Sequence, residues 1–259
     1  MIKNHRNSYL LDSGGTSARP STYVADVGLA DIGRPSLDHE HLESVLAAKF
    51  PKHPFEDLAA RQIEALAPSY LQMSAAFPFI LERANGRLHS HRASLGTDIG
   101  HDLEISNVVS SFLSWDETGG FAATATRGNP ALPSILETER YHANLLRDDF
   151  SKLFGHSVAP QFDAITNEYL ARLFHGLSNN DAVTRCAWMA SFEAHAERMI
   201  DSLWGSLDAA YDKGKESLAY FRIHVGGDDP AEAYHVAMTE AMVDAMVPEG
   251  EEHRFLVEF

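Results

Sequence analysis

The densest group of possible metal ligands in this 259-residue sequence lies between residues 219 and 236. It contains two histidines, His224 and His235, and two adjacent aspartates, Asp228 and Asp229. Imidazole and carboxylate groups together favour a transition metal that is bound through nitrogen and oxygen rather than through sulfur. Because His224 and Asp228 are four residues apart, a continuous helix would place both on one face, where they could bind the same ion.

Three helix breakers, Gly226, Gly227 and Pro230, interrupt this segment. In a helix interior, Gly costs about 1 kcal/mol relative to Ala and Pro costs about 3 kcal/mol. The sequence therefore predicts a helix that is weak or broken here and that becomes ordered when its ligand binds. Since Pro favours the first turn of a helix, the pattern also predicts a last helix from Ala231 to about Met246.

Two side chains of that last helix compete to complete the ligand set after Asp228. Glu232 and His235 are three residues apart and share a helical face. Glu232 is stabilised near the helix N-terminus as a solvated acid, whereas His235 is flanked by apolar residues and would otherwise lack a partner. We therefore expect His235, rather than Glu232, to be the ligand.

A second pair of possible ligands, Glu139 and His142, lies on a predicted helix from residue 135 to residue 154. A carboxylate and an imidazole three residues apart can reach one ion from the same helix, as in metal-binding helical bundles. The acidic partner of His142 stays open among Glu117, Glu137 and Glu139.

A third contribution comes from a long helix predicted over residues 180–211. Its apolar face is marked by Trp188, Phe192 and Met199, and Glu193 lies closer to that face than Glu197 does. A carboxylate at the edge of an apolar face needs a partner, and we expect Glu193 to be a metal ligand. A buried salt bridge with an arginine would explain the same position.

Helical periodicity extends along most of the chain, and the predicted class is all-α. Residues 1–35 are rich in Gly, Ser and Pro and predict an extended N-terminal arm, whereas residues 36–259 predict a single helical domain. Residues 87–100, which include His89 and His91, are expected to form a loop. The only strand signal is the apolar run at residues 255–257.

The composition excludes several partners. The chain has 37 acidic and 21 basic residues, and its formal net charge of -16 opposes binding to a phosphate backbone or an anionic membrane. No apolar run is long enough for a membrane span, and no signal-peptide core follows the basic start. The single cysteine, Cys186, cannot form an internal disulfide. We therefore expect a cytoplasmic protein without nucleic-acid or membrane partners.

The order of these motifs resembles that of the heme-oxygenase-like diiron oxidases and oxygenases. The resemblance covers about residues 69–246. The residues that carry it are Trp115-Asp116-Glu117-Thr118-Gly119-Gly120, His142 through Gly155, Glu193, and Phe221-Arg222-Ile223-His224 through Asp228. Where the family places its closing histidine, three residues after Asp228, this chain has Ala231, and His235 is the nearest candidate.

This resemblance implies a heme-oxygenase-like bundle of about seven or more helices. It also implies two Fe²⁺ ions, with O₂ as cosubstrate. The expected ligands are Glu139, His142, Glu193, His224, Asp228 and His235. The implied activity is N-oxygenation or oxidative C–C cleavage of a small amino-acid-like substrate in specialised metabolism, and the family's ligand helix orders with iron.

Further expectations concern the substrate and the partners. Arg140 and Arg222 lie near the proposed ligands and could hold a substrate carboxylate, although they could equally pair with acidic ligands. An external electron donor could supply electrons, and we expect a homodimer. Two alternatives stay open: a metal-free enzyme of the same fold, thiaminase-like or acting in quinone biosynthesis, and a non-enzymatic helical interaction protein.

Overall fold

The computed structural model describes residues 36–120, 137–211, 214–228 and 231–259. Every regular element in these ranges is a helix, which confirms the predicted all-α class. Among the described helices, none is both long and apolar enough to cross a membrane. The predicted N-terminal arm, residues 1–35, lies outside the described ranges.

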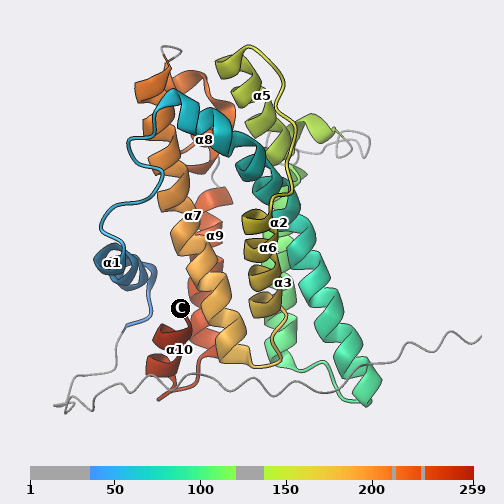
Figure 1. Cartoon of the computed structure of the whole chain (residues 1–259). Helices are drawn as coiled ribbons and strands as arrows, with labels where there is room; N and C mark the ends of the chain where they lie inside the picture. Colours follow the sequence, from blue (N-terminus) through green and yellow to red (C-terminus); the bar gives the residue numbers. More distant parts are fainter. Residues whose placement is uncertain (1–35, 121–136, 212–213, 229–230) are drawn as a thin grey trace, which may run out of the picture. The chain divides into compact units, whose positions relative to one another are not determined.

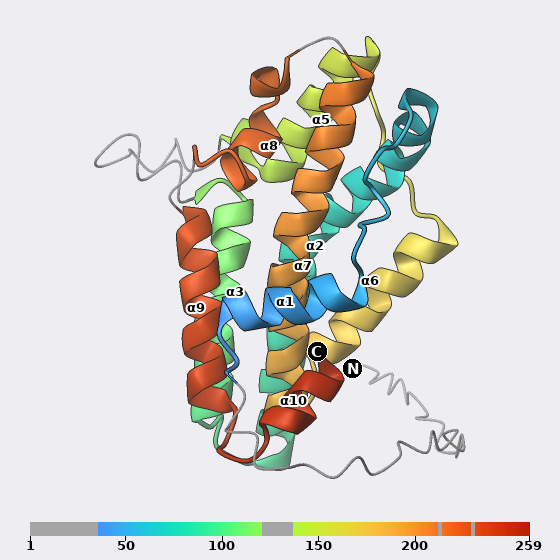
Figure 2. The same cartoon turned by 90° about the vertical axis from the view of Figure 1, so that its left-hand side faces the viewer.

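The two longest helices organise the bundle (Figures 1 and 2). Helix α2 packs against α3, α5 and α6, whereas α7 packs against α1, α6, α9 and α10; α3 also packs on α9, and α5 on α8. The elements are α1 (His39–Lys49), α2 (Ala60–Leu95), α3 (His101–Glu117), η2 (Thr138–Arg140), α5 (His142–Phe154), α6 (Ala164–Leu177), α7 (Ala182–Ala210), η3 (Lys215–Ser217), α8 (Ala219–His224), α9 (Ala231–Met246) and α10 (Glu252–Glu258).

Two clusters of buried apolar side chains hold these helices together. One joins α2, α3, α6, α7, α9 and α10, and includes Leu81 and Leu113. The other joins α2, α5, α7 and α8, and includes Phe150, Leu203 and Phe221, each fully buried. Burying one Leu or Phe side chain contributes about 1.5–3 kcal/mol. The second cluster therefore fixes α5 and α8, the two short helices that carry His142 and His224.

Helix α2 differs from the sequence prediction, which placed a loop over residues 87–100. It continues through Pro68 and Pro78, includes His89 and His91, and ends only at Gly96, whose φ of 64° closes the last turn. A proline in a helix interior costs about 3 kcal/mol. Apolar side chains buried along α2 offset that cost. They include Tyr70, Leu71, Phe77, Leu81, Ala84 and Leu88.

Two further predictions of secondary structure are wrong. The predicted helix over residues 135–154 begins only at His142, because Tyr141 has φ −55° and ψ 129°, outside the helical region, and separates η2 from α5. The apolar run at residues 255–257 is part of helix α10 rather than a strand. Phe255 is fully buried there and packs in the first core cluster.

Candidate metal centre

Acidic and imidazole side chains from four helices line one cavity of about 240 Å³. One of them, Glu197 of α7, is 57% exposed. The other five are Glu117 of α3, Glu193 of α7, His224 of α8, and Glu232 and His235 of α9. Each is shielded from solvent, with side-chain exposures between 6% and 25%. Because a buried carboxylate is costly without a compensating charge, this cluster requires protons or a bound cation.

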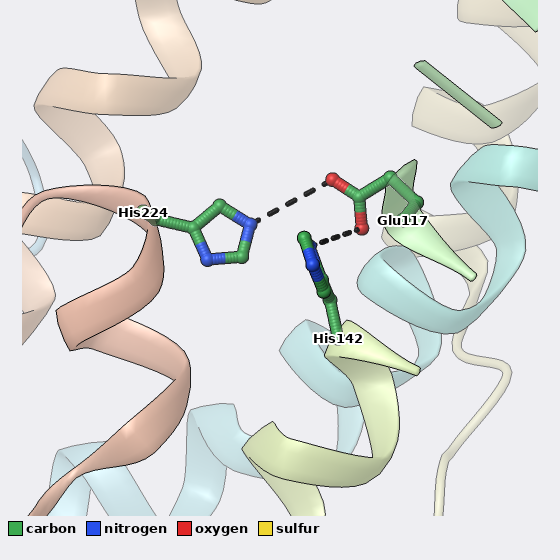
Figure 3. Close-up of side chains that lie close together, drawn as sticks. All are labelled: Glu117, His142 and His224. Carbon is green, nitrogen blue, oxygen red and sulfur yellow. Dashed lines mark ion pairs between the residues drawn. The ribbon is translucent and has the colours of Figure 1, made fainter. Parts of the chain in front are cut away.

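The first group of side chains that could hold a metal ion consists of Glu117, His142 and His224 (Figure 3). The two oxygens of Glu117 point toward different rings. Glu117 Oε2 lies 3.3 Å from His142 Nδ1, and Glu117 Oε1 lies 3.7 Å from His224 Nε2. The side chains come from the end of α3, the start of α5 and the end of α8, so three separate helix termini converge here.

Local hydrogen bonds leave nitrogen atoms of this group free to bind a metal. The Nδ1 of His224 lies 2.8 Å from the backbone carbonyl oxygen of Tyr220, to which it donates, so Nε2 is the nitrogen that could bind a metal after losing its proton. The Nδ1 of His142 is buried and makes no hydrogen bond of good geometry with any described residue. A buried nitrogen without a hydrogen bond needs a partner, and a metal ion held together with Glu117 could supply it.

The second group consists of Glu193, Glu232 and His235. The Nδ1 of His235 lies 3.8 Å from Glu193 Oε2 and 3.5 Å from Glu232 Oε2. The other oxygen of Glu232 is buried without a hydrogen-bond partner among the described residues, and it lies 3.9 Å from His224 Nε2. Glu232 therefore lies between the two groups.

Asp116 lies beside His235 and can orient its ring, and with Glu232 and His235 it also forms a group that could hold a metal ion. Its Oδ2 is 3.0 Å from His235 Nε2, and both side chains are buried. Because a carboxylate accepts this hydrogen bond, Nε2 carries a proton, and Nδ1, which faces Glu193 and Glu232, is the nitrogen that could bind a metal after losing its own proton. This carboxylate–histidine pair is the arrangement that fixes the ring of a metal-binding histidine.

Electrostatics in the cavity favour a bound cation. Burial, together with neighbouring Glu232 and Glu117, raises the pKa of Glu193 to about 7, although His235 opposes this. Burial alone would lower the pKa of the histidines, but nearby carboxylates raise it to about 9 for His224 and about 10 for His235. Without metal, the acids are therefore balanced by protons on the imidazoles.

A close approach of the backbone positions Glu117 beside His142. Gly119 follows the end of α3 with a φ of 78°, and a Cβ added there would lie 2.7 Å from the carbonyl oxygen of Arg140. Only glycine fits this contact between the end of α3 and the turn that precedes α5. Gly119 therefore allows the end of α3 and the start of α5 to approach, which places Glu117 beside His142.

The other end of α3 is anchored by a buried arginine. Arg185 of α7 is 3% exposed, donates from NH2 to Asp102 Oδ2 at 2.8 Å and from Nε to Ser106 Oγ at 2.9 Å. Since a charge-assisted bond at a buried site is strong, this contact fixes α3 against α7. It thereby helps to set the position of Asp116 and Glu117 relative to Glu193.

The structure brings together four of the six ligands expected from the sequence: His142, Glu193, His224 and His235. Of the three acids left open as the partner of His142, Glu117 is the one beside it. Glu232 was set aside in favour of His235, yet both lie in the cavity. The sequence pattern that could have identified both residues is Glu-x-x-His at positions 232–235. Because α9 is a continuous helix there, both side chains lie on one face.

Two expected ligands, Glu139 and Asp228, lie elsewhere, and both need correction. Glu139 is exposed in the turn η2, because Tyr141 interrupts the helix that would have aligned it with His142. Asp228 is exposed, because α8 ends at His224 and Gly227 has a φ of 77°. The helical spacing assumed for both residues does not exist.

The arginines expected to hold a substrate carboxylate also do not line the cavity. Arg222 pairs with Asp228 and donates from NH1 to the carbonyl oxygen of Glu216 at 3.3 Å. Arg140 lies 3.6 Å from Glu137. Asp228 and Glu137 therefore neutralise these guanidinium groups outside the cavity.

No protein-family model matches this chain, and no curated protein or solved structure matches it either. Its function is therefore inferred from the side chains of the cavity.

Asp116→Asn should weaken metal binding without unfolding the chain. The amide is nearly the same size but accepts a weaker hydrogen bond, so His235 loses its orientation and basicity. Loss of such an outer partner lowers metal affinity by about tenfold to a hundredfold. Zn²⁺ titration followed by calorimetry measures the change. The controls Glu139→Gln and Asp228→Asn should bind zinc as the unmodified protein does, and a loss of zinc in either one would restore that residue to the ligand set.

The metal-free protein should lose stability as the pH rises from about 6.5 to about 10. The pKa values of His224 and His235 rise from 6.5 to about 9 and about 10 in the folded state. The folded chain therefore holds more protons than the unfolded chain in this window, and the free energy of unfolding falls as pH increases. Thermal unfolding in the presence of a chelator measures the slope.

A matched pair of variants assigns this slope to the cavity. His235→Gln should flatten it, whereas His253→Gln, at an exposed position, should leave it unchanged. Added Zn²⁺ should stabilise the protein more at the upper end of the window, because neutral imidazoles bind metal. Equal slopes in the two variants would refute the role of His235.

Proposed function

We propose that this protein is a non-heme diiron enzyme that uses O₂ to oxidise a small organic substrate. One observation carries the proposal: two groups of possible nitrogen and oxygen ligands lie side by side, and all of them except His142 line one cavity. Each group offers at least one carboxylate and one imidazole, a combination suited to iron. The ligands are Glu117, His142 and His224 in one group, and Glu193, Glu232 and His235 in the other.

The resemblance to the heme-oxygenase-like diiron oxidases and oxygenases supports this proposal. That family's pattern has a glutamate at the end of a glycine-terminated helix, then a histidine, a lone helical glutamate and a further histidine. Glu117, His142, Glu193 and His224 occupy these places in the same order. The last part departs from the pattern, since Glu232 and His235 lie in the cavity where the family uses an aspartate and a histidine.

Buried atoms without partners indicate that the cavity fits such ions. His142 Nδ1 and Glu232 Oε1 have no hydrogen bond within the described ranges, and they belong to different groups. Two ferrous ions would bind both atoms, and their positive charge would more than offset that of the three carboxylates. When bound, they would supply the electrons and the open coordination positions that O₂ reduction requires, which no side chain can provide.

The protein's own residues would bind the substrate and control water. Phe77 and Phe192 stack with ring centroids 3.9 Å apart, and Met199 and Ile200 continue the same apolar wall. Such a wall holds an organic substrate and excludes water from the reacting atoms. Tyr220 also lines the cavity. Its hydroxyl group remains protonated, because burial raises its pKa well above the usual value.

Anaerobic titration with Fe²⁺ should give about two irons per chain, because there are two groups of ligands. Glu193→Ala and His224→Ala should lower this to one or none, with far-UV circular dichroism unchanged, because apolar packing holds the helices. Subsequent exposure to O₂ should consume O₂ and produce a transient visible absorption. His253→Ala is the matched control and should retain both irons. Full iron occupancy in both ligand variants would eliminate the diiron proposal and leave a metal-free enzyme or an interaction protein.

A further inference from the structure

One buried acid has no part in the chemistry proposed above. Asp149 of α5 is fully buried, yet it is not among the described residues that line the cavity. It lies about two helical turns after His142, so both side chains project from the same face of α5. Its Oδ1 is 3.2 Å from the Nζ of Lys152, whose side chain is 57% exposed. A buried carboxylate needs further hydrogen bonds, which its second oxygen makes to another helix.

This second oxygen caps helix α8. Asp149 Oδ2 lies 2.8 Å from the backbone nitrogen of Tyr220, which donates to it. The first N–H groups of a helix have no carbonyl partner within that helix, and Leu218, which precedes α8, makes no side-chain capping bond within the described chain. Burial raises the pKa of Asp149, and hydrogen bonds from the N–H groups of Tyr220 and Ala219 oppose that rise. A side chain of α5 therefore satisfies the start of α8.

Tyr220 connects this cap to a proposed metal ligand. Its carbonyl oxygen accepts a hydrogen bond from His224 Nδ1 at 2.8 Å. One residue thus binds Asp149 through its N–H group and the imidazole ring through its carbonyl group. Because the second bond leaves His224 Nε2 facing Glu117, 3.7 Å away, the position of Tyr220 determines where this nitrogen points.

Apolar packing restricts α8 less closely than this hydrogen bond does. The helix has only six residues, and helices shorter than about 12 residues are marginal without outside contacts. Phe221 anchors it in the second core cluster, but apolar attraction has no preferred direction. A hydrogen bond weakens steeply away from a linear arrangement. The bond from Tyr220 to Asp149 therefore fixes the rotation and the axial position of α8.

We propose that Asp149 is a positioning residue of the candidate metal centre, which holds α8 so that His224 faces Glu117 and His142. Asp149 itself does not touch the metal. Because His142 and Asp149 belong to the same helix, the contact also fixes the two histidines of the first group relative to each other. The inference rests on the proposed function, since the first group is one of its two sets of ligands.

Zinc titration of the full chain tests this role through metal affinity rather than activity. Asp149→Ala should weaken one of two zinc sites by about tenfold or more, the range for a group that orients a metal-binding histidine. Asp149→Asn keeps an oxygen that can accept from Tyr220 and should recover most of the affinity. The matched control Lys152→Met removes the ammonium group beside Asp149 and should leave both sites unchanged.

Two outcomes of this titration would overturn the inference. One is that Asp149→Ala binds both ions as tightly as the unmodified protein. The other is that Asp149→Asn or Lys152→Met loses as much affinity as Asp149→Ala, because charge rather than the hydrogen bond to α8 would then matter.

Two backgrounds separate the positioning of His224 from a general loss of stability. In His224→Ala, the zinc site that remains is that of Glu193, Glu232 and His235, and adding Asp149→Ala should not change its affinity. In His235→Ala, the remaining site is that of the first group, and adding Asp149→Ala should again weaken it by about tenfold or more. Equal losses in the two backgrounds would mean that Asp149 only stabilises the fold, contrary to the inference.

Amide hydrogen exchange tests the contact without any substitution, and so does not depend on how Asp149→Ala folds. In the metal-free chain, the N–H of Tyr220 should exchange much more slowly than in an unstructured peptide, because Asp149 accepts its hydrogen bond. Exchange at the rate of an unstructured peptide would contradict the role of Asp149.

The zinc content of the unmodified protein keeps the two proposals distinguishable. Two bound ions, with no effect of Asp149→Ala on either, contradict only the role of Asp149. A chain that binds no ion in the cavity contradicts the proposed function, and with it the inference that rests on it.

Discussion

Three carboxylates that face one buried cavity, those of Glu117, Glu193 and Glu232, impose the constraint on which the rest of the structure depends. Like charges this close repel strongly in a medium of low dielectric constant, so the cluster itself opposes folding until protons or cations balance it. The helices must therefore be held by other contacts. Two apolar clusters provide them, and one buries the short helices that carry His142 and His224.

The chemistry of the site was more predictable than its geometry. His142, Glu193, His224 and His235 were singled out from residue types, order and helical periodicity, and the structure brings these four side chains close to one another and to further acids. Their partners depend on where helices begin and end, which spacing alone does not determine. The non-helical backbone of Tyr141 separates Glu139 from the helix of His142. The end of α8 at His224, before two glycines, likewise leaves Asp228 outside the cavity. Glu117 and Glu232 lie in the cavity instead. The sequence left Glu117 open as one of three possible partners of His142, and Glu232 was set aside in favour of His235.

The fold also has some features that sequence periodicity predicts and others that depend on packing between helices. Helical periodicity predicted the class and the approximate bounds of α7 and α9, because long amphipathic patterns are distinctive. It did not predict that α2 continues through Pro68 and Pro78, since that outcome depends on apolar burial against neighbouring helices. Three apolar residues at 255–257 fit a strand or a helix equally well, and only the packing of Phe255 decides.

The central claim, that two metal ions lie between five helices in one cavity, is tested most directly by anomalous X-ray diffraction at the iron absorption edge. Crystals would be grown without O₂ in the presence of Fe²⁺. The account predicts two strong peaks inside the cavity, one beside each ligand group. The ligands are expected to be Glu117, His142 and His224 for one peak, and Glu193, Glu232 and His235 for the other. The absence of a peak in the cavity, or a peak only at surface carboxylates such as Asp228, would contradict it.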